Sequence, residues 1–88
     1  MTQNFIKELK FLGFTFEKEG SCDVYTYIAS RTEILEIYLS KNDNPHFRIT
    51  VFLGVTDDFF EHYGDVESID QIKNIIKDKD NWWKYAAN

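Results

Sequence analysis

Apolar residues near the start of the chain recur at helical spacing. They are Phe5, Ile6, Leu9 and Leu12. Thr2 can cap a helix that begins there, and Gly13 stands where a left-handed residue would end it. We therefore expect a first helix over residues 3–12.

The chain then changes to an alternation of apolar and polar residues, which is the pattern of half-buried strands. The turn Glu19-Gly20-Ser21 separates the first two strands, and a polar loop at 40–45 separates the next two. Pro45 can stand at the head of the fourth strand, because the first residue of a strand need not donate to the ladder. The predicted strands span residues 14–17, 22–29, 35–39 and 46–53.

After Gly54 the pattern changes again, and two structures fit it. A short helix would begin at Thr56 or Asp57 and end at Gly64, whereas a fifth strand fits the same residues. We expect the helix over residues 57–63 and keep the strand as the alternative. The apolar residues in question are Phe59, Phe60 and Tyr63.

Ser68 and Gln71 match a capping box at the start of another helix. The apolar stripe that follows consists of Ile69, Ile72, Ile75 and Ile76. These signals predict a C-terminal helix over residues 69–79. The tail at 81–85 either continues that helix or forms a separate docked turn.

Together these elements predict one α+β domain over residues 1–88. Its economical architecture is an antiparallel four-stranded β-meander, or a five-stranded one if 57–63 is a strand, with the N-terminal and C-terminal helices on one face. A chain of this length buries roughly 60 to 65 % of its unfolded surface. Eight Phe, five Tyr and two Trp residues help to build a core within that margin.

The cellular setting is indicated by cysteine content and by the N-terminal pattern. Cys22 is the one cysteine of the sequence, so no intramolecular disulfide can form and a reducing environment fits. The N-terminus has no basic stretch followed by an apolar run, and the apolar stretch at 51–55 is far shorter than a membrane span. We expect a soluble cytoplasmic protein without membrane contact.

Charge is distributed unevenly along the chain. Residues 49–72, here called the acidic segment, contain no Lys or Arg, which leaves nine acids against ten bases elsewhere. The net charge of −5 therefore arises in this segment, and such segregation produces a field that steers basic partners. The six acids of the segment are Asp57, Asp58, Glu61, Asp65, Glu67 and Asp70.

The acidic segment has two interpretations. On a helix, Asp57, Glu61 and Asp65 would follow one another about 6 Å apart along the axis, a pitch that resembles a phosphate backbone. A basic nucleic-acid groove would accept such a surface. Alternatively, the acids form an ordinary solvated face, with Asp57 and Asp58 placed in a first helical turn.

Metal binding and catalysis have little support in the sequence. Side chains that could offer ligands to a divalent ion are Asp57, Asp58, Glu61, His62 and Asp65. Their order does not match a calcium loop, and His62 has no helical histidine partner, since His46 lies 16 residues earlier. Cys22 could pair with a histidine as a nucleophile, but a lone cysteine is more often a small buried hydrophobe. We expect no metal, no cofactor and no enzymatic activity.

Two adjacent tryptophans near the C-terminus, Trp82 and Trp83, are followed by Lys84 and Tyr85. Neighbouring side chains on a helix point about 100° apart, so both indoles do not easily enter one core. We expect one of them to be exposed or half covered. Exposed tryptophan is typical of interface hot spots, whereas the alternative is that both rings pack on a small core.

One family resemblance follows from the layout of the chain. The segment 5–10, which reads Phe-Ile-Lys-Glu-Leu-Lys, is followed at 13–17 by Gly-Phe-Thr-Phe-Glu. This helix-then-strand opening, with the acidic and aromatic composition, resembles small phage-encoded inhibitors of bacterial defence, the anti-CRISPR proteins and DNA mimics. The resemblance implies an inhibitor and assigns no site residue. Immunity proteins and antitoxins that neutralise basic nucleases share this physical profile.

The expected function is therefore non-catalytic inhibition of a CRISPR effector or another nuclease by occlusion of its basic surface. The partner is a basic nucleic-acid-binding protein, and the negative field disfavours direct contact with nucleic acid. The alternative is a small accessory or regulatory domain that acts through protein–protein contact or self-association, for instance as a homodimer. The expected contacts are the six acids of the acidic segment with Phe59, Phe60 and Tyr63, or Trp82 and Trp83, as apolar anchors.

Overall fold

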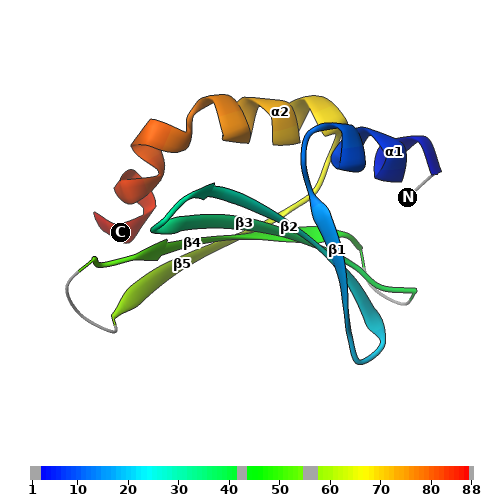
Figure 1. The fold of residues 1–88 in the computed structure, drawn as a ribbon, viewed down its shortest axis with the longest axis horizontal. Coiled ribbons are helices and arrows are strands. Elements are labelled where there is room, and N and C mark those ends of the chain that lie inside the picture. Colours follow the sequence, from blue (N-terminus) through cyan, green and yellow to red (C-terminus); the bar gives the residue numbers. More distant parts are fainter. Residues whose placement is uncertain (1–2, 42–43, 55–57, 88) are drawn as a thin grey trace.

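The computed structural model describes residues 3–41, 44–54 and 58–87, which fold into a curved sheet with helices along one face (Figure 1). The sheet is an antiparallel meander in the order β1-β2-β3-β4-β5, so β1 and β5 form its two edges. The α+β class and the placement of helices on one face are thus confirmed. The elements are α1 (Gln3–Phe11), β1 (Thr15–Glu19), β2 (Cys22–Ser30), β3 (Glu33–Leu39), β4 (His46–Phe52), β5 (Phe59–Asp65), α2 (Ile69–Lys77) and a 3₁₀ helix, η1 (Lys79–Ala87).

Local sequence signals located α1 and the first four strands. Helix α1 ends at Phe11, and Gly13 follows it with a φ of 106°, a left-handed conformation that favours glycine. The cap predicted at Thr2 lies outside the described residues. Each observed strand overlaps its predicted range, with boundaries that differ by a residue or two.

The helix predicted over residues 57–63 is wrong, because residues 59–65 form the fifth strand. Strand β5 pairs with β4 from Phe52↔Phe59 to His46↔Asp65. Gly64 does not end a helix but lies within β5, opposite Phe47, where a Cβ atom would come 2.5 Å from the Phe47 ring. The start predicted at Thr56 or Asp57 lies outside the described residues. Pairing with β4 has overridden the local helical spacing of the aromatic residues.

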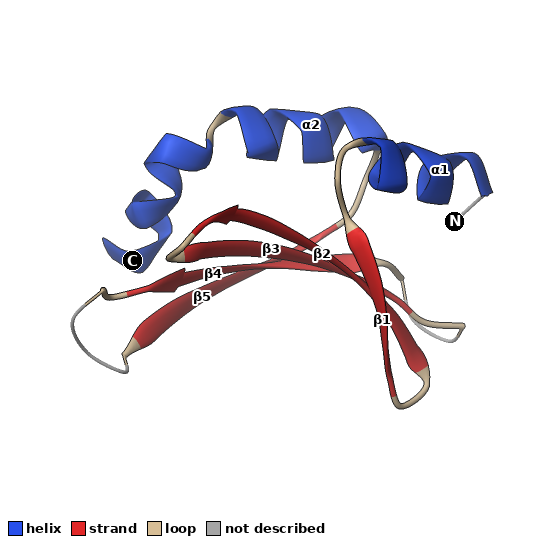
Figure 2. Cartoon of the chain, viewed as in Figure 1, coloured by secondary structure: helices blue, strands red, loops and turns tan. Residues whose placement is uncertain are grey.

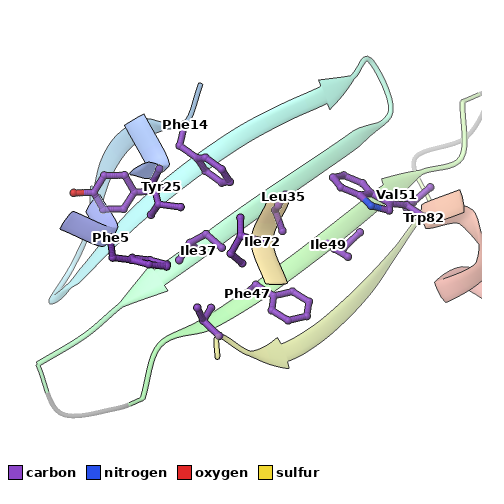
Figure 3. Packing of buried hydrophobic residues seen from close by; sticks show 12 residues of the cluster. Phe5, Phe14, Tyr25, Leu35, Ile37, Phe47, Ile49, Val51, Ile72 and Trp82 are labelled. Atoms are coloured by element: carbon purple, nitrogen blue, oxygen red, sulfur yellow. The ribbon is translucent and has the colours of Figure 1, made fainter. Parts of the chain in front are cut away.

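The core lies between the sheet and the three helices (Figure 3). Alternate residues of the central strands face the helices and are fully buried, for example Leu35 and Ile37 of β3 and Ile49 of β4. Burial of each such side chain contributes about 1.5–3 kcal/mol. Side chains that the helices contribute to this core are Phe5, Leu9, Ile72 and Trp82.

The capping box of α2 is present, except that the Gln71 side chain accepts from the backbone N–H of Glu67 instead of that of Ser68. Ser68 Oγ accepts a hydrogen bond from the Gln71 backbone N–H at 3.1 Å, and the Gln71 side chain accepts one from the Glu67 N–H at 2.7 Å. Gln71 Nε2 also donates to the Asp65 carbonyl at 2.9 Å, so the same side chain holds the end of β5 to the start of α2.

The tail forms a separate helix rather than a continuation of α2. Helix α2 ends at Lys77, earlier than predicted, and η1 turns away from its axis (Figure 1). The Trp82 indole N–H donates to the Ile75 carbonyl at 2.8 Å, so a carbonyl near the α2 C-terminus gains a partner. None of the helices in the described part of the chain has the length and apolar character that a membrane crossing requires.

Candidate binding face of the sheet

The side of the sheet opposite the helices is here called the open face, and no helix formed by the described residues covers it (Figure 2). Successive side chains of a strand point to opposite sides, so the neighbours of Leu35, Ile37 and Ile49 lie on this face. The strand register brings together on it Glu17, Thr26, Ile28, Ile34, Glu36, Tyr38, His46, Arg48, Thr50, Phe52, Phe59, Glu61, Tyr63 and Asp65.

An ion-pair network occupies the middle of the open face. Arg48 on β4 lies opposite Glu36 on β3, and its Nε and Nη2 atoms donate to Glu36 Oε1 at 2.9 and 2.6 Å. On the other flank, Arg48 Nη1 lies 3.0 Å from Glu61 Oε2 on β5. The side chains of Glu36, Arg48 and Glu61 are 14, 27 and 28 % exposed, so water screens them less than a surface pair. The network ties the three strands together.

Aromatic side chains surround Arg48 and support its charge. Partial burial disfavours the charged guanidinium, but hydrogen bonds with Glu36 and Tyr63 outweigh that effect and raise the pKa of Arg48 above its usual value. The guanidinium carbon lies 5.3 Å from the centre of the Tyr38 ring, and that ring stacks on His46 at 4.9 Å. Arg48 is therefore a fixed cation that organises the face.

A patch of apolar side chains lies at the β4–β5 end of the open face. Phe52 and Phe59 are register partners whose ring centres lie 6.0 Å apart at an angle of 51°. Both rings are partly exposed, as are the side chains of Tyr63 on β5 and Ile28 on β2. Exposed aromatic residues beside charged ones are a composition typical of protein-binding surfaces.

The open face is also hollowed. A groove with a volume of about 340 Å³ runs across it, and all five strands line it. The β1–β2 hairpin bends away from the helices (Figure 2), and Glu17 and Thr26 of its two strands line the groove. The lining residues are Glu17, Thr26, Ile34, Glu36, Arg48, Thr50, Phe52, Phe59 and Glu61.

The acids of the acidic segment do not share one face. Glu61 and Asp65 lie on the open face, whereas Asp70 lies in the first turn of α2, on the other side of the sheet. Asp58 and Glu67 are exposed just before and just after β5, and Asp57 lies outside the described residues. The phosphate-like helical pitch predicted from Glu61 to Asp65 does not occur, because residues 59–65 are extended.

The predicted apolar anchors also divide between surfaces. Phe59 and Tyr63 lie on the open face, while Phe60 occupies the opposite side of β5. Trp82 is 0 % exposed and packs in the core, whereas Trp83 is 62 % exposed. The expected split between the two tryptophans is thus present, and Trp83 is the member of the pair that a partner could touch.

Strand alternation also separates the candidate metal ligands. His62 lies 6.1 Å from the Phe47 ring, measured between ring centres, on the helix side of β5, while Glu61 points to the open face. Within residues 3–41, 44–54 and 58–87, no three His, Cys, Asp or Glu side chains are placed to hold one metal ion. Cys22 is a half-buried free thiol at the start of β2.

Sequence reasoning did not identify Glu36, Tyr38, Arg48 and Phe52 as site residues. The feature of the sequence that could have identified them is their place at the alternating polar and aromatic positions of the predicted strands 35–39 and 46–53. Only the register of β3 on β4 shows that Glu36 and Arg48 are partners. Comparison of the chain with protein-family models, curated proteins and solved structures found no match.

Proposed function

We propose that this protein is a non-catalytic binding protein that inhibits a nucleic-acid-processing protein by covering its basic surface with the open face. The observation that supports this function is the combination of negative charge and exposed aromatic rings on one hollow surface. Among the described side chains of the strands, this face carries Glu17, Glu36, Glu61 and Asp65 against Arg48.

The two components of this surface have different physical roles. Carboxylates steer a basic partner before contact and raise its association rate, whereas buried aromatic anchors slow its dissociation. Nucleic-acid-processing proteins present Lys- and Arg-rich grooves, to which the open face is complementary in charge. The same charge repels phosphates, so the protein should not bind DNA or RNA itself.

The experiment measures cleavage by a panel of purified CRISPR effectors and bacterial nucleases with and without the protein. We expect the protein to inhibit at least one of them. The double variant Glu17→Lys/Asp65→Lys should inhibit the same enzyme at least 10-fold more weakly than the parent protein does. The matched control is Asp70→Lys/Asp80→Lys, which makes the same charge change on α2 and η1, away from the open face.

Three outcomes contradict the proposal. One is equal loss of inhibition in the two double variants, because net charge rather than the open face would then be responsible. Another is a mobility shift of duplex or single-stranded DNA or RNA by micromolar protein alone at physiological salt. Failure to inhibit or bind any member of the panel would also contradict it.

A second candidate is an accessory or regulatory domain that acts through self-association. The observation that favours it is the position of β5 at the edge of the sheet, where none of the described strands pairs with its outer side, together with the exposed rings of Phe59, Phe60 and Tyr63. Two β5 strands paired antiparallel across a twofold axis at Tyr63 would, however, place Glu61 of each copy opposite Asp65 of the other. Sedimentation at low and high salt separates the candidates, since salt-promoted dimers support self-association.

A further inference from the structure

The groove on the open face has the size and lining of a receptor for one side chain. Its volume of about 340 Å³ is near the lower end of ligand sites, which span roughly 300–1,000 Å³. Strands at both edges of the sheet contribute to its walls, with Glu17 from β1 and Phe59 from β5. It can therefore enclose a group from several sides.

The electrostatics of the groove favour a cation. Its lining contains the carboxylates of Glu17, Glu36 and Glu61 and the guanidinium of Arg48, which leaves an excess of two negative charges. Both Arg48 hydrogen bonds to Glu36 end on the same oxygen, Oε1. An ionised carboxylate has about four lone-pair sites, so Glu36 and Glu61 have capacity for further donors.

The apolar wall of the groove also suits a cationic side chain. Phe52 and Phe59 lie at an angle of 51° and both line the hollow. An aromatic face attracts a cation within about 6 Å of its centre, and a planar guanidinium stacks on such a face. The aliphatic part of an arginine would cover the rings while its head reaches the carboxylates.

We propose that the groove receives an arginine side chain of the partner, with Glu36 and Glu61 as acceptors, Glu17 as a further negative charge in the wall and Phe59 as the stacking surface. This inference rests on the proposed function and names the chemistry that the open face recognises. Arginine fits better than a compact ammonium, because its fork of donors can engage two carboxylates while its plane lies on the ring.

The test needs no partner protein. N-acetyl-L-arginine methylamide is titrated into ¹⁵N-labelled protein and compared with the citrulline analogue, which has similar shape and no charge. We expect the arginine compound to shift backbone amides of the lining residues with a dissociation constant on the order of 1 mM. The citrulline compound should bind at least 10-fold more weakly.

Matched variants locate the binding. Glu17→Gln and Phe59→Ala remove a negative charge and a ring from exposed positions, and each should weaken arginine binding 3-fold or more. Glu67→Gln and Phe11→Ala make the same chemical changes at exposed positions outside the groove, and each should leave binding unchanged. The amide spectra themselves report whether each variant is folded.

Equal binding of citrulline and arginine would overturn the inference, and so would arginine-induced shifts that lie outside the groove. Equal effects of Phe59→Ala and Phe11→Ala would overturn it as well. Its failure is distinguishable from failure of the proposed function, which is measured by nuclease inhibition. Loss of inhibition in Glu17→Lys/Asp65→Lys without any arginine binding would retain the function and exclude this receptor.

Discussion

The two faces of the sheet are built from the same strands and have opposite properties. On the helix side, Leu35, Ile37 and Ile49 are almost completely buried in an apolar core. Glu36 stands next to Leu35 on β3, and Arg48 stands next to Ile49 on β4. These two residues face the other side of the sheet and form a partly exposed ion pair. One face therefore supplies most of the folding free energy, and the other is left to carry charge, aromatic rings and a groove.

The strongest test of this division is the tryptophan pair, because only one of the two rings belongs to the core. Trp82→Ala should destabilise the protein by about 3–5 kcal/mol, which approaches the whole stability of a small domain. Trp83→Ala should change it by about 0.5 kcal/mol or less, since its ring is mostly exposed. Thermal melts followed by circular dichroism measure both. Two equally large losses would contradict the division.

The next effect is expected at Gly64 on β5, where the Phe47 ring occupies the place of a side chain. Gly64→Ala should cost about 1–3 kcal/mol, because the added methyl would overlap a buried ring. Gly54→Ala is the control, since a Cβ there meets nothing within 4 Å. Chemical denaturation of both variants gives the comparison. A neutral Gly64→Ala would mean that the core under β5 is loosely packed.

A smaller effect is expected from the open face. Arg48→Met leaves Glu36 and Glu61 without their shared cation and should cost about 1–2 kcal/mol, less than a fully buried pair because the groups are partly solvated. Lys73→Met removes the exposed contact of Lys73 with Glu8 at 3.7 Å and should cost about 0–0.5 kcal/mol. Urea titration of each variant measures the difference. Equal losses of unfolding free energy in Arg48→Met and Lys73→Met would show that the Arg48 network contributes no more than an exposed ion pair.

The smallest effect concerns Asp78 at the junction of α2 and η1. Hydrogen bonds from Asn81 and Lys84 lower the pKa of Asp78 below its ordinary value of 3.8. A lowered pKa stabilises the fold above the ordinary value, and this contribution is lost as the pH falls through the folded-state pKa. Asp78→Asn should therefore lower the melting temperature slightly at pH 7. The difference from the parent protein should shrink as the pH falls below about 3.8 and disappear once the pH has passed the folded-state pKa, and a constant difference would exclude this cause.

Local signals were sufficient for the elements that depend on neighbouring residues. Gly13 ended α1 and the Ser68–Gln71 cap began α2 because each acts within one turn of helix. Strand β5 could not be found in this way, since its aromatic spacing fits a helix and its partner β4 lies several residues away. The candidate site could not be predicted from local signals either, because the Glu36–Arg48–Glu61 network depends on the register of three strands.

The meander also has a kinetic consequence. Each strand pairs with its neighbour in sequence, so sheet formation requires only short loops to close, with small losses of chain entropy. Topologies with such local pairings fold faster than those with distant ones, and single hairpins form within about 1–10 μs. Contacts of α1 with α2 join distant parts of the chain. We therefore expect the hairpins to assemble first and the docking of the helices to limit the folding rate.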